Sequence, residues 1–163
     1  MIEAVIFDLD GTLVQLPIDY KTLFEEFSRI MHASNVRPIV DTISRADEKT
    51  RKLVYAAWDK AELAVEKQVS ANEAGMEIYK AHADKRKALV TLQGKAIVEA
   101  ILKRFGLSFD VVVIREDALF RVDQLKKAAE ALNVNHSNVL FVGDTDGDAN
   151  AAKKLGCQFQ RIN

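Results

Sequence analysis

The sequence predicts an α/β protein with a doubly wound parallel sheet and a small all-helical insert after the first strand. Two observations lead to this prediction. Short runs of apolar, often branched residues alternate with segments of helical spacing in the second half of the chain. Between the first and second apolar runs, by contrast, lies a long stretch with several helical patterns and no convincing strand.

The expected strands are too short for helices and apolar at successive positions, as in strands buried on both faces of a parallel sheet. They are Ile2 to Phe7, Ala88 to Leu92, Val111 to Ile114 and Val139 to Val142, with Cys157 to Ile162 as a weaker fifth. Segments of helical spacing follow the second, third and fourth runs, and two of them should stop at Gly106 and Gly156. Strands that alternate with helices in this way imply right-handed crossovers.

The helical insert is expected to form a separate cap domain. One apolar stripe lies behind Asp19 as a possible helix cap, and another includes Trp58, which we expect in the core of the cap. The segment Ser70 to Glu73 reads SANE, a capping-box pattern that predicts the start of a further helix. The expected bounds are 1–14 and 86–163 for the core domain and 15–85 for the cap.

Composition excludes several classes of protein. The 163 residues, of which 48% are hydrophobic, are enough for one globular core and a modest insert. Because 23 lysines and arginines balance 24 acids, the chain lacks the charge expected for binding nucleic acid or an anionic membrane. Cys157 is the only cysteine, which rules out an internal disulfide and makes a zinc site a poor hypothesis.

The N-terminal segment lacks the features of a targeting signal. It has an acid at Glu3 and no basic leader, and its apolar run is too short for a signal peptide or a membrane span. Together with the single cysteine, which fits a reducing compartment, these features lead us to expect a cytoplasmic protein.

Acidic residues gather where the expected strands end. The first strand runs into Asp8-Leu9-Asp10-Gly11-Thr12, the second ends at Thr91, and the fourth runs into Gly143-Asp144-Thr145-Asp146-Gly147-Asp148. In an open parallel sheet the ligand crevice lies beyond the carboxyl ends of the strands. We therefore expect these three distant segments to deliver carboxylates and a hydroxyl group to one place.

Carboxylates this close repel one another and raise their own pKa values unless a cation lies among them. Hard oxygen ligands with room for water favour magnesium over zinc. A cation held by Asp8 and Asp144 would also neutralise a phosphate group, which the same acids would otherwise repel. Gly11 and its turn free backbone N–H groups to face the phosphate oxygens. These residues therefore predict a site for phosphoryl transfer.

The motifs DLDGT after the leading strand, a threonine at the end of the second and GDTDGD after the fourth resemble those of the haloacid dehalogenase superfamily. The resemblance covers the whole chain, with the motifs in the same order. Within the superfamily, the sequence is similar to the phosphatase branch, and there to the phosphoglycolate phosphatase-like hydrolases that carry a helical cap. It implies a Rossmann-like core of five parallel strands with the first strand at the centre. It also implies magnesium-dependent hydrolysis of a small phosphorylated metabolite, a phosphate monoester, through an aspartyl-phosphate intermediate.

The resemblance further implies roles for the acids. Asp8 would be the nucleophile, and Asp10 would protonate the leaving oxygen and then activate water, with Thr12 orienting Asp10. Magnesium would be held by Asp8, the Asp10 backbone carbonyl and Asp144, with Asp148 helping directly or through water. Members of the dehalogenase branch lack an acid at the position of Asp10. The presence of Asp10 therefore indicates that the substrates are phosphate esters and not haloacids.

Two phosphate ligands would complete the site. The resemblance implies that Thr91 hydrogen-bonds the phosphoryl group. The third family motif is a lysine, and its place here reads Phe120-Arg121-Val122-Asp123, so Arg121 would stand in for that lysine. A planar guanidinium can bind phosphate bidentately, but it is not interchangeable with an ammonium group. Lys126, one turn inside the following helix, is the alternative.

Other functions share parts of these motifs. A phosphomutase of the same superfamily also uses the two aspartates but returns the phosphoryl group to its substrate. A non-catalytic regulatory or binding protein on the same scaffold would explain the departure at Arg121, although intact Asp8, Asp10 and Asp144 argue against it. A phosphorylated receiver domain lacks both the DxDGT order and the helical insert.

Overall fold

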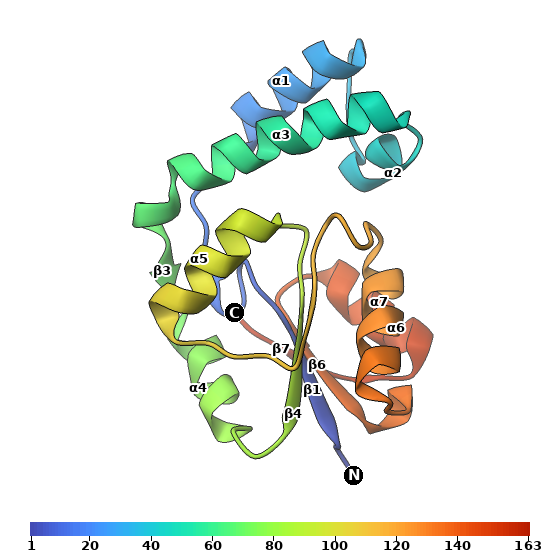
Figure 1. Ribbon diagram of the computed structural model, residues 1–163. Coiled ribbons are helices and arrows are strands. Elements are labelled where there is room, and N and C mark those ends of the chain that lie inside the picture. The colour runs from blue at the N-terminus through green and yellow to red at the C-terminus, as the bar shows by residue number, and fades with distance from the viewer.

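The computed structural model describes residues 1–163 and confirms the predicted α/β fold with its helical insert. Five parallel strands form the main sheet in the order β5-β4-β1-β6-β7, so the first strand is central, as expected (Figure 1). Their bounds are β1 Ala4–Asp8, β4 Arg86–Val90, β5 Val111–Val113, β6 Val139–Gly143 and β7 Gln158–Arg161. The weak apolar run near the C-terminus is therefore an edge strand of this sheet.

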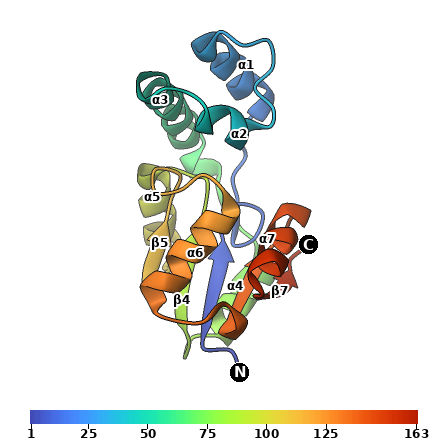
Figure 2. The same cartoon turned by 90° about the vertical axis from the view of Figure 1, so that its right-hand side faces the viewer.

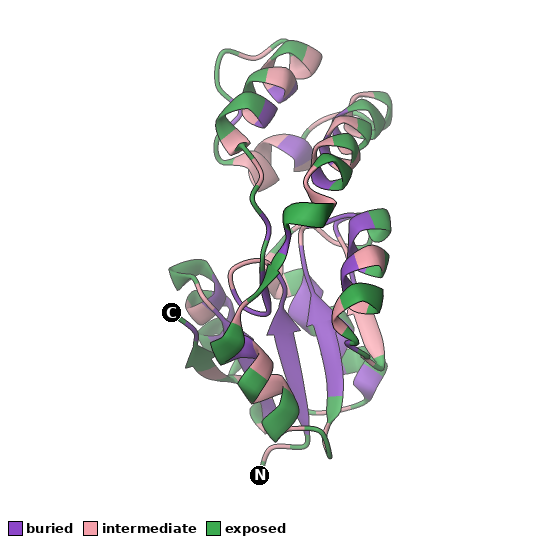
Figure 3. Ribbon diagram, turned by 90° about the vertical axis from the view of Figure 1, so that its left-hand side faces the viewer, coloured by how far each residue is buried: buried purple, intermediate pink, exposed green.

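Helices cover both faces of the sheet (Figures 1 and 2). Helices α4 and α5 pack on one face, and α6 and α7 pack on the other. Side chains of β1 alternate between the two apolar clusters, with Val5 and Phe7 in the first and Ala4 and Ile6 in the second. Burial on both faces explains the unbroken apolar run of this strand (Figure 3). The bounds are α4 Glu73–Ala81, α5 Lys95–Phe105, α6 Arg121–Leu132 and α7 Asp146–Leu155.

Several helix ends follow signals in the sequence. Helices α5 and α7 end at Gly106 and Gly156, whose φ angles of 65° and 82° lie in the left-handed region that glycine adopts easily. Asp19 caps α1 and accepts a hydrogen bond from a backbone N–H of its first turn. A helix does begin at the SANE segment, because α4 starts at its last residue, Glu73. The capping box itself is wrong, since Ser70 lies in a short strand and the residue before the helix, Asn72, makes no side-chain cap bond.

Two short strands join the insert to the core and correct the expectation that the insert contains none. Strand β2, Val14–Gln15, leads into the insert, and β3, Ser70–Ala71, leads out of it. The two pair antiparallel, so the two crossings of the chain are held together. Just beyond β3, Asn72 donates from its backbone N–H to the Leu13 carbonyl at 2.9 Å and from its side chain to the Gly11 carbonyl at 3.3 Å. The neck of the insert is thereby fastened to the loop after β1.

Helices α1, α2 and α3 lie together beyond the carboxyl ends of the strands (Figures 1 and 2). They share a small apolar core of their own: Leu23, Phe27, Val36, Ile43, Val54 and Trp58. Their bounds are α1 Tyr20–Met31, α2 Ile39–Ser44 and α3 Glu48–Ala64, with short 3-10 turns elsewhere at Glu66–Gln68 and His136–Asn138. Helix α4 instead packs beside the sheet, where the Tyr79 ring lies 5.9 Å from that of Phe7. The cap boundary at residue 85 stays a prediction. None of the helices has the length and apolar character needed to span a membrane.

A buried arginine ties α3 to the core. Arg115, in the segment after β5, is 1% exposed, and its guanidinium donates to both carboxylate oxygens of Glu62 at 2.9 and 3.0 Å and also contacts Asp59. Glu62 accepts a further hydrogen bond from the Gly94 N–H at 3.2 Å, and Arg115 donates to the Leu92 carbonyl at 3.0 Å. The cap helix and the loop after β4 are therefore held together by one polar network.

This network determines orientation more than it adds stability. Burial raises the pKa of Glu62, while the nearby Arg115 guanidinium acts in the opposite direction. A buried ion pair gains little net free energy, because desolvation offsets the attraction, yet removing one partner leaves the other charge uncompensated. The Arg115 guanidinium also stacks over the Trp58 ring at 4.4 Å. A rotation of α3 away from the core would break the contacts of Arg115 with both Glu62 and Trp58.

We predict that Glu62→Ala lowers the free energy of unfolding by about 3 to 5 kcal/mol, because it strands a buried guanidinium. Asp59→Ala is the matched control, since the Asp59 side chain is 41% exposed and its ion pair should contribute below about 1 kcal/mol. Urea denaturation of both variants measures the difference. Equal losses in the two variants would show that the Glu62–Arg115 pair does not have this role.

Candidate active site

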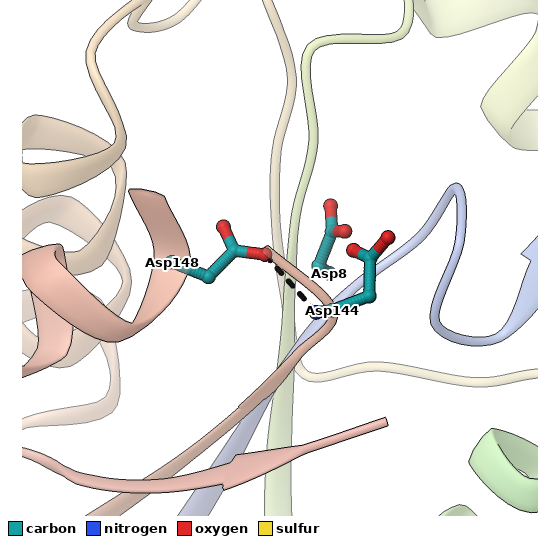
Figure 4. Close-up of side chains that lie close together, drawn as sticks. All are labelled: Asp8, Asp144 and Asp148. Carbon is teal, nitrogen blue, oxygen red and sulfur yellow. Dashed lines mark hydrogen bonds between the residues drawn. The ribbon is translucent and has the colours of Figure 1, made fainter. Parts of the chain in front are cut away.

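Three carboxylates from distant segments meet at the carboxyl ends of β1 and β6 (Figure 4). Asp8 is the last residue of β1, Asp144 directly follows β6, and Asp148 lies in the first turn of α7. One oxygen atom from each lies within 4.8 Å of the others. The strands end side by side because they pair in parallel with Phe7 opposite Val142. The structure thus confirms that the segments after β1 and β6 converge, as the sequence predicted.

Arg121, the first residue of α6, brings a positive charge to these acids. Its Nη2 lies 3.0 Å from Asp8 Oδ1, and its Nε lies 2.9 Å from Asp148 Oδ1. Lys126, the alternative considered from the sequence, is exposed and forms no ion pair with any acid of the cluster. Of the two candidates, only Arg121 contacts the acids.

The electrostatics of the cluster favour a cation. Burial raises the pKa of Asp8 well above its usual range, Arg121 lowers it, and the neighbouring Asp148 and Asp144 raise it further. Burial also raises the pKa of Asp10 to about 6, against the lowering effect of a hydrogen bond from the Leu16 N–H at 2.9 Å. The three clustered acids offer only hard oxygen ligands, so they form a group that can hold a metal ion.

The loop after β1 has a fixed backbone shape. The Leu9 carbonyl accepts hydrogen bonds from three successive N–H groups of residues 12–14. Gly11 has a φ of 84°, and a Cβ atom at this position would lie 2.1 Å from Asp144 Oδ2, so only glycine fits. Its N–H donates to the Val14 carbonyl at 2.8 Å and is not free to face phosphate. In the structure, the absence of a side chain at Gly11 leaves room for the Asp144 carboxylate.

Thr12 has different partners from those expected. Its hydroxyl lies 3.3 Å from Asp8 Oδ2 and 3.3 Å from Asp144 Oδ1. The side chain of Asp10 is held instead by the backbone N–H of Leu16. The structure thus corrects the expected contact between Thr12 and Asp10, because Thr12 bridges the two neighbouring acids of the cluster.

Asp148 is held by contacts at the start of α7. Thr145 caps this helix, since its hydroxyl accepts from the Asp148 N–H at 3.0 Å. The Asp148 carboxylate accepts in return from the Thr145 N–H at 3.4 Å and from the Asp144 N–H at 3.2 Å, the bond dashed in Figure 4. Because its other oxygen binds Arg121, Asp148 positions both the Asp144 loop and the arginine. Asp146 is exposed and turns away to an ion pair at the surface.

Two buried glutamines support the site and were missed in the sequence. The Thr91 hydroxyl contacts the Gln93 side chain and accepts from the Gln93 N–H at 3.1 Å. Gln124 donates to the Thr91 carbonyl at 2.8 Å and to the Ala118 carbonyl at 2.9 Å, and it accepts from Arg121 Nη1 at 2.7 Å. The only signal for Gln124 is its place beside the apolar stripe of α6, which alone does not distinguish a buried glutamine from an exposed one.

A cleft of about 470 Å³ separates the acids from the cap, which is a suitable size for a small ligand. The core side is lined by Asp8, Asp10, Leu92, Gln93, Arg121, Asp144 and Thr145. The cap side is lined by Tyr20, Phe24, Arg37, Ile39 and Trp58. Thr91 is fully buried and does not line the cleft, whereas Gln93 does, so the predicted contact of Thr91 with phosphate stays a prediction.

Similarity to known proteins agrees with this geometry. The chain is 27% identical to an uncharacterised hydrolase of Saccharomyces cerevisiae, over 96% of this chain and 75% of that protein. A haloacid dehalogenase-like family protein of Streptococcus pneumoniae has the same fold, with a TM-score of 0.72 at 16% identity over 99% of this chain and 85% of its own.

CbbY of Rhodobacter sphaeroides also has this fold, with a TM-score of 0.67 at 18% identity over 98% of this chain and 85% of its own, and its structure holds phosphate. A CbbY variant was solved with xylulose-(1,5)bisphosphate and gives a TM-score of 0.65 at 18% identity over the same shares of the two chains. The family model for haloacid dehalogenase-like hydrolases matches residues 5–162. With a match over nearly its whole length, this chain belongs to the haloacid dehalogenase-like hydrolases.

Proposed function

We propose that this hydrolase is a magnesium-dependent phosphatase that cleaves a small-molecule phosphate monoester through an aspartyl-phosphate on Asp8. The observation that carries the proposal is the position of Asp8 at the wall of a cleft, where it contacts the Arg121 guanidinium and forms, with Asp144 and Asp148, an acidic group able to hold a metal ion. The phosphate and sugar bisphosphate found in CbbY support a phosphorylated ligand.

The first step is attack on phosphorus by an Asp8 oxygen. The Thr12 hydroxyl and the Arg121 Nη2 both contact the Asp8 carboxylate and restrict its rotation. A bond forms from the Asp8 oxygen to phosphorus while the bond from phosphorus to the alcohol oxygen breaks. Arg121 offers planar N–H donors beside this carboxylate and would stabilise the charge on the phosphoryl oxygens as it redistributes.

Asp10 would move the protons. It lines the cleft two residues after Asp8, and its raised pKa of about 6 keeps part of the population protonated near neutral pH. In the first step its proton goes to the leaving alcohol oxygen. In the second, the same carboxylate takes a proton from the water that attacks phosphorus, and the Asp8 carboxylate leaves as inorganic phosphate forms.

The acids at the site would hold a divalent cation, which would complete the charge balance. Asp8, Asp144 and the backbone carbonyl of Asp10 would hold magnesium, which when bound neutralises a phosphate group approaching these acids. Asp148 would help to hold the ion directly or through water, and it also accepts a hydrogen bond from the Asp144 N–H and pairs with Arg121. Gly11 leaves the space that the Asp144 carboxylate needs in order to face the site.

We predict that the purified protein hydrolyses 4-nitrophenyl phosphate with magnesium, loses this activity on chelation and regains it with excess magnesium.

Asp8→Asn should abolish turnover because the amide is not a nucleophile. Asp146→Asn is the matched control, since this exposed acid of the same motif should leave the rate unchanged. Hydrolysis that persists after exhaustive chelation would contradict the proposed metal dependence.

We predict that Arg121→Ala lowers kcat/KM by about 30- to 1000-fold, which corresponds to about 2 to 4 kcal/mol of lost transition-state stabilisation. Arg121→Lys should recover part of this loss, because it keeps the charge but not the fork of donors. Lys126→Ala should cost little, since Lys126 does not reach the acids. The reverse ranking of the two alanine variants would give Lys126 the role assigned to Arg121.

A further inference from the structure

The cap side of the cleft contains a cation without a partner. Of the two arginines that line the cleft, Arg121 is engaged by Asp8 and Asp148. Arg37 lies between α1 and α2, is exposed, and its guanidinium forms neither an ion pair nor a hydrogen bond within the protein. Three acids line the core side of the same cleft, yet none lies within ion-pair distance of Arg37.

Packing restricts where the Arg37 guanidinium can lie. Its Cζ atom is 5.1 Å from the centroid of the Phe24 ring, a cation–π distance, and Phe24 itself stacks on the buried Phe27 at 5.8 Å. Ile39, two residues further along the chain, lines the same cleft. The Phe24 ring covers one face of the guanidinium, so the N–H donors at its edge remain available to an anion in the cleft.

The position of the cap is also fixed. The Glu62–Arg115 pair and its hydrogen bonds to Leu92 and Gly94 fasten α3 to the core. Trp58, on the same face of α3, packs with Phe27 and also lines the cleft. The cap side that carries Arg37 therefore faces the acids from a defined direction, as a binding site requires.

We propose that Arg37 binds a second anionic group of the substrate, at the far end of the alcohol from the phosphate that is cleaved. This inference rests on the proposed phosphatase function and narrows its substrate class to phosphate monoesters whose alcohol carries a carboxylate or a second phosphoryl group. The scissile phosphate occupies the core side at Asp8 and Arg121, so the rest of the molecule extends toward the cap. A guanidinium there matches either anion through two parallel N–H donors.

Three matched compounds test this assignment in the magnesium-loaded protein: 3-hydroxypropyl phosphate, 3-phosphooxypropanoate and propane-1,3-diol bisphosphate. The first has an uncharged end, and the others end in a carboxylate and a phosphate. The measured quantity is the preference, which is kcat/KM for each anionic compound divided by kcat/KM for the uncharged one. Which of the two anionic compounds has the higher preference identifies the kind of anion.

We expect the preference of the native protein to fall by about 10- to 100-fold in Arg37→Gln, the range for losing hydrogen bonds to a charged group. Arg37→Lys should retain part of it. Arg45→Gln is the control, because Arg45 is an exposed cap arginine that does not line the cleft. An equal preference in the native protein and in Arg37→Gln would overturn the assignment, even if 4-nitrophenyl phosphate is hydrolysed normally.

The test also separates this inference from the proposed function. If no phosphate ester is hydrolysed, the phosphatase proposal fails, and calorimetric titration with the same three compounds still measures the preference of the cleft as a ratio of dissociation constants. Tighter binding of the anionic compounds that is lost in Arg37→Gln would support the subsite. Equal binding of all three would refute it.

Discussion

The crowding of carboxylates at the ends of β1 and β6 is the constraint on which the rest of the site depends. Parallel pairing of the two central strands forces Asp8 and Asp144 together, and α7 adds Asp148. Arg121 offsets part of this charge, and the buried Gln124 holds the arginine in place. The negative charge that remains makes the cluster suitable for a metal ion.

A second buried charge organises the opposite side of the cleft. Arg115 is 1% exposed, and its buried charge is compensated by Glu62 of α3. The same network binds the backbone of residues 92–94, directly after the segment that holds Thr91. The cap and the core side of the cleft are thus coupled through polar contacts. A change in the orientation of α3 would also disturb the loop that lines the site.

Local patterns in the sequence were enough to predict the sheet, its helices and the acids at its edge, because apolar runs, terminal glycines and motif acids are properties of short segments. Contacts between distant segments were not predictable in this way. The SANE segment correctly predicted that a helix begins there, but not its cap, because pairing between β2 and β3 places Ser70 in a strand and this non-local contact overrides the local cap signal. The partners of Thr12 and the burial of Arg115 likewise depend on segments far away along the chain.

The central claim, that Asp8 carries the phosphoryl group, can be tested by chemical trapping. The protein would be quenched with acid during turnover of an aryl phosphate and treated with borohydride, which reduces an aspartyl-phosphate to homoserine. Mass spectrometry of the peptides then locates the modified position. Our account predicts homoserine at position 8, and none when the substrate is left out. Homoserine at another aspartate, or steady turnover with no trapped modification at position 8, would contradict it.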